Sequence, residues 1–123
     1  MATTPAKATF PLILEDTYVR QDEQGRFSLN DLHQAAGGEE QHTPWRFTRS
    51  ETFRGLVDVL TPEMVSEPVA VVSSGRPSTF VARELVYAYA MWISPAFHLK
   101  VIRTFDALVT GRLGGNNSGT MIG

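Results

Sequence analysis

The fold of this 123-residue chain is indicated most clearly by the stretch SSGRPSTFV at residues 73–81. It follows a run of valines with β-strand character and leads into a strongly helical segment. Gly75 and Pro77 supply turn geometry, and the residues after them resume extended character. The pattern therefore predicts a short hairpin with Arg76 at its tip.

Two interpretations of this hairpin are open from the residues alone. A cationic hairpin next to a helix is typical of the wing of a DNA-binding module, because an arginine on a rigid hairpin reaches a groove or a phosphate at little ordering cost. The alternative is a surface hairpin whose arginine only keeps the protein soluble. Other features of the chain must decide between them.

Length and composition favour one small globular domain. The chain has 42% hydrophobic residues, and its apolar stretches are far shorter than the roughly 18 residues that span a bilayer. We therefore expect a soluble protein with no membrane partner, and no signal peptide is evident at the N-terminus. The absence of cysteine excludes disulfides, thiol nucleophiles and thiolate metal sites, and it is compatible with a reducing cytoplasm.

The charge is unevenly distributed along the chain. The net charge is −2, with −4 in residues 1–40, −1 in residues 41–68 and +3 in residues 69–123. Nine of the eleven basic residues are arginine, whose planar fork suits phosphates and guanine edges. The overall balance is not that of a generic basic nucleic-acid binder, but the later segments can form a cationic face.

The first half of the chain reads as extended segments that lead into a short helix. We expect strands at residues 10–14, 18–20 and 26–29, a turn at residues 22–25 and a helix at residues 31–36. Asn30 is the expected N-cap of that helix, where its role is structural. Gly37 and Gly38 are expected to end the helix in a left-handed conformation.

The second half is dominated by helical patterns. Thr43 and Pro44 open a turn in which Trp45 is expected to belong to the core, and Ser50 caps a helix through Leu60. After the hairpin, two helices separated by Ser94–Pro95 carry the widest apolar face and should form the main core, with Gly111 as the expected end. We thus expect a flexible lead at residues 1–9, one domain at residues 10–110, and a disordered Gly/Asn-rich tail at residues 111–123.

These landmarks resemble the KilA-N domain of bacteriophage and large DNA virus proteins, which is itself similar to fungal APSES domains. The matching segments are FSLNDLHQAAG at residues 27–37, then Trp45, Arg46, Arg49 and Ser50, then GRPSTFV at residues 75–81 with Leu85, Tyr89, Ala90, Trp92, Ile93, Ser94, Pro95 and Phe97. The resemblance covers roughly residues 10–110. It implies a small α+β domain, with one wing-like hairpin packed on a helical core, that binds duplex DNA.

Candidate DNA contacts follow from placement and charge. Arg76 is the first choice, and the hydroxyls of Ser78 and Thr79 beside it can donate to phosphate oxygens. Arg83 lies at a helix start, where a cation is unfavourable unless an anion such as phosphate binds there or a carboxylate pairs with it. Residues 46–54 place further arginines about one turn apart, and the alternative for them is a solvated helix surface paired with Glu51 and Asp58. The expected nucleic-acid-binding residues are Arg46, Arg49, Arg54, Arg76, Ser78, Thr79 and Arg83.

An enzyme is not expected. His33, His42 and His98 fall in three separate elements without the spacing of metal ligands, so no metal is expected. The sequence also has no nucleophile elbow, no phosphate-binding loop and no HExxH motif. We expect neither catalytic residues nor a cofactor.

Two functional hypotheses remain at this point. The first is a phage or prophage regulatory protein of the host bacterial cytoplasm that binds duplex DNA, sequence-specifically or in general, through the wing and an arginine-bearing helix. The alternative is a protein-interaction module, an antirepressor or host-factor inhibitor, that presents the acidic residues 15–40 to a host or phage protein. A homodimer is a further expectation by analogy with other small DNA-binding modules.

Overall fold

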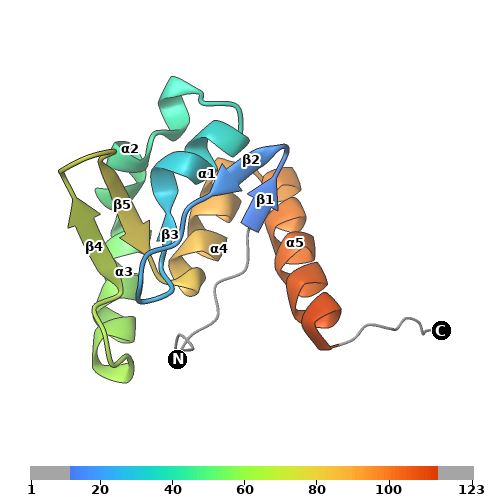
Figure 1. The fold of residues 1–123 in the computed structure, drawn as a ribbon. Coiled ribbons are helices and arrows are strands. Elements are labelled where there is room, and N and C mark those ends of the chain that lie inside the picture. Colours follow the sequence, from blue (N-terminus) through green and yellow to red (C-terminus); the bar gives the residue numbers. More distant parts are fainter. Residues whose placement is uncertain (1–11, 114–123) are drawn as a thin grey trace.

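The computed structural model describes residues 12–113, with side chains as far as residue 108. The described part is a small α+β domain with two antiparallel sheets and five α-helices, so the expected fold class is confirmed (Figure 1). The predicted lead at residues 1–9 lies outside it, as do residues 114–123 of the tail predicted at residues 111–123. In chain order the elements are β1 (Leu12–Leu14), β2 (Thr17–Val19), β3 (Phe27–Ser28), α1 (Leu29–Ala35), η1 (Glu40–His42), α2 (Pro44–Thr48), α3 (Glu51–Leu60), η2 (Thr61–Glu63), β4 (Val69–Val72), β5 (Ser78–Val81), α4 (Arg83–Ile93) and α5 (Pro95–Leu113).

The N-terminal strands form a hairpin of their own. Leu12 pairs with Val19, and the turn between β1 and β2 places Glu15 and Asp16 at positive φ. The chain then makes the expected turn at residues 22–25, with Gly25 at φ +81°. β3, which follows this turn, does not belong to the β1–β2 sheet. It pairs with β5 in the sheet that contains the predicted wing, a pairing that the sequence pattern does not indicate.

The wing, defined here as the β4–β5 hairpin with its connecting loop (residues 69–81), is present as predicted. Its strands pair from Val69 with Val81 to Val72 with Ser78, and Gly75 in the loop has φ +64°. A residue with a side chain is strained at that angle, which explains the glycine. The strand order is β3-β5-β4, so β5 is the central strand and is hydrogen-bonded on both sides.

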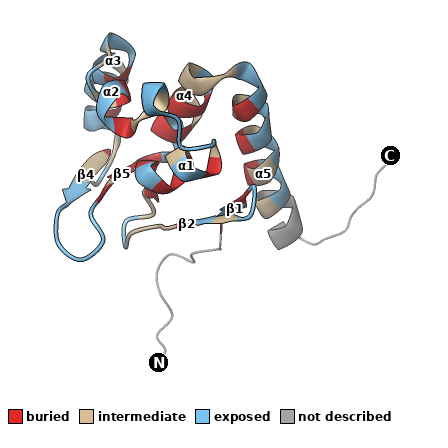
Figure 2. Ribbon diagram, turned by 90° about the horizontal axis from the view of Figure 1, so that it is seen from above, coloured by how far each residue is buried: buried red, intermediate tan, exposed pale blue. Residues whose placement is uncertain are grey.

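The main core lies between the α4–α5 pair and the elements packed on it (Figures 1 and 2). Ser94 caps α5, because its Oγ accepts a hydrogen bond from the Phe97 amide at 3.0 Å. The buried residues of the two helices include Leu85, Val86, Tyr89, Phe97, Val101 and Phe105, as their helical spacing predicts. The predicted helix end at Gly111 is wrong, since α5 continues to Leu113.

The short helix α2 corrects one prediction about the core. Phe47, not Trp45, enters the core: it is fully buried, with ring centroids 5.3 Å from Phe53 and 5.1 Å from Tyr89, whereas Trp45 is 66% exposed. In a helix of only five residues that begins at Pro44, positions i and i+3 share one face. Burial of Pro44 and Phe47 therefore turns Trp45 outward.

Candidate nucleic-acid interface

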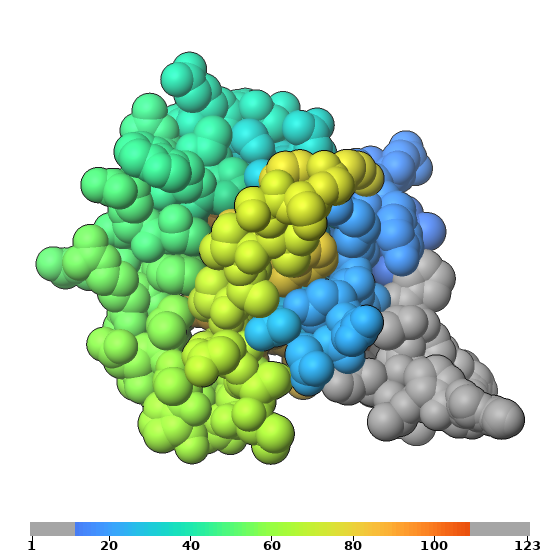
Figure 3. Space-filling model, turned by 60° about the vertical axis from the view of Figure 1, so that its left-hand side comes forward, coloured from blue at the N-terminus to red at the C-terminus, as the bar shows by residue number. Residues whose placement is uncertain are grey.

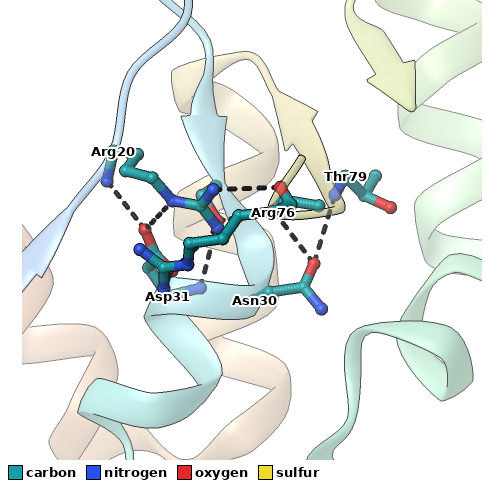
Figure 4. A network of polar contacts seen from close by, with 7 residues as sticks. Arg20, Asn30, Asp31, Arg76 and Thr79 are labelled. Atoms are coloured by element: carbon teal, nitrogen blue, oxygen red, sulfur yellow. Dashed lines mark hydrogen bonds and ion pairs between the residues drawn. The ribbon is translucent and has the colours of Figure 1, made fainter. Parts of the chain in front are cut away.

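The first helix begins earlier than its sequence suggests, and this changes the role of Asn30. Ser28 is the N-cap of α1, because its Oγ accepts from the Asp31 amide at 3.1 Å, so the expected cap at Asn30 is wrong. β3 runs directly into α1, which moves the cap two residues toward the N-terminus. Asn30 Oδ1 instead accepts from Ser78 Oγ at 3.0 Å and from the Thr79 amide at 3.1 Å (Figure 4). Asn30 therefore fastens β5 of the wing to α1.

A partly buried ion pair between Arg20 and Asp31 lies beside the hydrogen bonds of Asn30. The backbone N and Nε of Arg20 both donate to Asp31 Oδ2, at 2.9 and 2.8 Å, and Nη2 donates to Oδ1 at 3.1 Å. Nη1 of the same guanidinium donates to the carbonyl of Arg76 at 3.1 Å (Figure 4). Arg20 thus connects the segment after β2, the first turn of α1 and the loop of the wing.

The surroundings of Asp31 favour its charged form. Burial raises the pKa of this carboxyl, but the hydrogen bonds from Arg20 and the positive charges of Arg20 and Arg76 outweigh burial and hold the pKa below its ordinary value of 3.8. Asp31 is therefore a carboxylate at neutral pH. Together with its two arginines it forms a group of net charge +1, so a positive charge remains at this end of the wing.

Arg76 is placed where the sequence predicted it, in the wing loop. Its side chain is 77% exposed, and Nη2 lies 3.7 Å from Asp31 Oδ1. Asp31 is already paired at shorter distance with Arg20, and a long, exposed contact of this kind contributes little. Arg76 can leave Asp31 to bind an external anion without breaking the Arg20–Asp31 pair.

The two hydroxyl residues beside Arg76 differ from each other. Ser78 is buried, with its Oγ 2.6 Å from Ser28 Oγ and hydrogen-bonded to Asn30 Oδ1. Its expected contact with a phosphate therefore has no support in the structure, because strand pairing turns this side chain inward. Thr79 is part-exposed and its side chain points away from the Arg20–Asp31 pair, so it remains a candidate (Figure 4).

Arg46, Arg49 and Arg54 lie on the exposed side of α2, the turn after it and the start of α3. Ser50 caps α3 as predicted, accepting from the Phe53 amide at 3.1 Å. In the described residues none of the three arginines forms an ion pair with a carboxylate. Their polar contacts are with backbone carbonyls instead: Arg46 Nε donates to Glu40 O at 3.2 Å, and Arg54 Nη2 donates to Arg49 O at 3.3 Å. The alternative, in which these arginines pair with Glu51 and Asp58, is therefore wrong for the described structure.

The wing and the α2–α3 segment are neighbours in space. Figures 1 and 2 place β4 and β5 alongside α2 and α3, and Figure 3 shows the wing as a ridge between the α2–α3 segment and the N-terminal strands. We name the exposed arginines of these two elements, Arg46, Arg49, Arg54 and Arg76, the arginine face.

Arg83 does not belong to this group. It is exposed at the first position of α4, at the opposite end of β5 from the wing loop. The N-cap Ala82 makes no side-chain capping bond, and Arg83 has no carboxylate within ion-pair distance among residues 12–108. It lines a shallow depression together with Gln21, Arg26 and Met64.

The acidic N-terminal segment is less negative at the surface than its sequence suggests. Of the seven carboxylates in residues 15–40, three pair with lysine or arginine. These are Asp31 with Arg20, Asp22 with Arg26 at 2.7 Å, and Glu15 with Lys100 at 2.8 Å. Part of the negative charge thus stabilises the fold and does not form an open acidic surface.

The sequence pattern assigns no functional role to two residues of this region, because it places Arg20 at the end of a strand and Asp31 at the start of a helix. A charged residue in a first turn is ordinary, so no local signal marks its partner eleven positions away. Among residues 12–108, no group of His, Asp or Glu side chains is placed to hold a metal ion, and no described helix is long and apolar enough to cross a membrane.

The wing, the helical core and the arginine face define a small winged α+β module. The chain belongs to the KilA-N domain family, whose match covers residues 14–111. It is 35% identical over 105 residues to the protein kilA of Escherichia phage P1, and this alignment covers 85% of the chain and 39% of that protein. The chain therefore spans about two fifths of this relative. No solved structure matches the chain significantly.

Proposed function

We propose that this domain binds duplex DNA through the arginine face, as part of a phage-related regulatory protein that acts in the host cytoplasm. The observation that carries the proposal is that Arg46, Arg49 and Arg54 are exposed and have no carboxylate partner among the described residues. Exposed arginines on adjoining elements that no described carboxylate neutralises are typical of a protein that binds phosphates.

The wing supports the same proposal by its rigidity. Arg20 and Asn30 hold the wing against α1 through the carbonyl of Arg76 and the amide of Thr79. A fixed backbone lowers the entropy lost when the Arg76 side chain binds a groove or a phosphate. Phosphate contacts are expected to supply most of the affinity, and one or two arginines any base readout.

The alternative, a protein-interaction module that uses the acidic segment, receives less support. Three of its seven carboxylates are occupied by internal ion pairs, which leaves Asp16, Glu23, Glu39 and Glu40 without a lysine or arginine in the described structure. A heparin column separates the two functions, because a polyanion-binding face retains the protein despite its pI near 5.9.

The direct test is fluorescence anisotropy with a labelled mixed-sequence duplex at several salt concentrations. Saturable binding is expected to weaken with salt, with a logarithmic slope of about −3 to −4 if all four arginines neutralise phosphates. A variant with Arg46, Arg49 and Arg54 changed to Ala should lose most of the binding. Arg103→Ala, on α5 away from the arginine face, is the control for the loss of one exposed arginine elsewhere and should bind like the wild type. No binding at low salt would instead favour the protein-interaction module, to be pursued by pull-down.

A further inference from the structure

Trp45 is the largest of the exposed hydrophobic side chains in the described structure. It is 66% exposed, although the aromatic cluster of Phe47, Tyr89 and Trp92 lies on the inner side of the same helix. The guanidinium carbon of Arg49 lies 4.5 Å from the centroid of the Trp45 ring. A planar guanidinium over an indole is a favourable cation–π arrangement.

The backbone beneath this pair is fixed. Phe47 is fully buried and sets the rotation of α2, so residue 45 is directed outward. Arg49 is the C-cap of α2; its amide donates to Arg46 O at 3.3 Å, and its carbonyl accepts from Arg54 Nη2. The stacked pair therefore stands on a rigid support, with neither residue engaged by a carboxylate in the described structure.

We propose that Trp45 is a positioning residue for DNA binding: it holds the Arg49 guanidinium in a fixed plane, so that the edge of the fork binds two acceptor atoms on the duplex. The inference rests on the DNA-binding function proposed above and deepens it. An unsupported arginine loses much rotamer freedom when it binds, whereas a guanidinium stacked on an indole has already lost part of it. The pair of acceptors is provided either by a phosphate or by O6 and N7 of guanine.

Replacement of Arg49 by lysine tests whether binding depends on the planar shape of the guanidinium or only on its positive charge. Lysine keeps the positive charge but has no planar fork that can stack on the indole and bind two acceptors at once. If the stack matters, Arg49→Lys should weaken binding more than Arg54→Lys does. Arg54 serves as the matched control because it lies on the same face, and the structure shows no aromatic ring beneath it.

The decisive experiment measures duplex affinity by anisotropy for the wild type, Trp45→Ala, Trp45→Phe, Arg49→Ala and the Trp45→Ala/Arg49→Ala double variant. Trp45→Ala should weaken duplex affinity by about threefold to tenfold with an unchanged melting temperature. Trp45→Phe should weaken it less, because phenylalanine keeps an aromatic ring under the guanidinium. The double variant should bind no more weakly than Arg49→Ala alone, because the indole acts through the arginine. Equal binding by Trp45→Ala and the wild type, or additive losses in the double variant, overturns the positioning role.

Two further readouts identify the acceptors and separate this inference from the function on which it rests. A salt slope flattened by about one in Arg49→Ala indicates a phosphate, whereas a loss confined to guanine-containing duplexes indicates a base edge. A wild type that binds no duplex overturns both proposals, whereas a wild type that binds while Trp45→Ala is unaffected overturns the positioning role alone.

Tryptophan fluorescence tests the stack in the free protein. In a Trp92→Phe background, which leaves Trp45 as the one tryptophan, adding Arg49→Ala should change the emission of the free protein. An unchanged emission means that the stack does not form in solution.

Discussion

The Arg20 guanidinium donates two hydrogen bonds to the Asp31 carboxylate, the Arg20 backbone N donates a third, and the same guanidinium donates to the carbonyl of Arg76 in the wing loop. The side chain of Asp31 is 6% exposed and that of Arg20 is 21% exposed. The contact therefore joins the first turn of α1 to the wing, two parts of the domain that are far apart in the sequence. It gives the wing a fixed position relative to the helical core.

Asp31→Asn should destabilise the domain by about 3 kcal/mol, because it leaves the partly buried Arg20 guanidinium without its carboxylate partner. The measurement is urea unfolding at pH 7, followed by circular dichroism. Asp16→Asn, at an exposed carboxylate with no lysine or arginine partner in the described structure, is the control and should change stability little. Equal stabilities of Asp31→Asn and the wild type would contradict the role given to the pair.

The pH dependence of stability should report the same ion pair. The pKa of Asp31 is lower in the folded protein than its ordinary value of 3.8, so its contribution is complete above that value and declines as the pH falls through the folded pKa. The wild type should therefore lose stability below about pH 4 more steeply than Asp31→Asn. Parallel curves for the two proteins between pH 5 and pH 2.5 would show that Asp31 titrates normally.

Asn30→Ala should loosen the wing without disturbing the helical core. The substitution removes the acceptor of the Thr79 amide and of the buried Ser78 hydroxyl, which should cost about 1–3 kcal/mol. Hydrogen exchange is the measurement: the Thr79 amide should lose protection relative to the wild type, while amides in the α4–α5 pair keep theirs. A uniform loss of protection across the domain would mean that the wing and the core open together.

Elements with local signals were predictable from the sequence, and long-range pairings were not. The wing, the cap at Ser50, the break between two helices at Ser94–Pro95 and the apolar faces of α4 and α5 follow from turn residues and helical spacing. The joining of β3 to β5 depends on contacts across about fifty residues, and it is this pairing that moves the α1 cap from Asn30 to Ser28. Hydrophobicity alone also misplaced Trp45, because helix length and Phe47 decide which side of α2 faces the core.

The candidate site could be predicted only in part, because the ion pairs of its residues depend on contacts between distant parts of the sequence. A basic residue can be recognised in a sequence, but whether a carboxylate pairs with it depends on the fold. Arg46, Arg49 and Arg54 have no such partner in the described structure, whereas Arg20 and Arg26 do. The acidic composition of residues 15–40 is misleading in the same way, since part of it pairs internally.

The two aromatic residues of α2 should behave in opposite ways when truncated. Phe47→Ala should cost about 3–5 kcal/mol, because it removes a fully buried ring from the cluster with Phe53 and Tyr89. Trp45→Ala should change the free energy of unfolding by less than about 0.5 kcal/mol, as expected for an exposed side chain. Chemical denaturation of both variants checks this, and a large loss of stability in Trp45→Ala would place the indole in the core.

Arg76 and Ser78 provide a final contrast between a surface role and a structural one within the wing. Arg76→Ala should leave stability nearly unchanged, since the side chain is 77% exposed, and it should weaken duplex binding by about 1–3 kcal/mol if Arg76 reads a guanine. If Arg76 only neutralises a phosphate, the salt slope should flatten by about one.

Ser78→Ala should lower stability and leave DNA affinity unchanged, because the buried hydroxyl is hydrogen-bonded to Ser28 and Asn30 inside the domain. It should lower stability by about 1–2 kcal/mol while the remaining folded protein keeps its DNA affinity. Anisotropy and urea unfolding on the same two variants make the comparison. If Arg76→Ala bound DNA with unchanged affinity and unchanged salt slope, the wing would have to be removed from the DNA-binding surface, and α2 and α3 would remain as its only arginine-bearing elements.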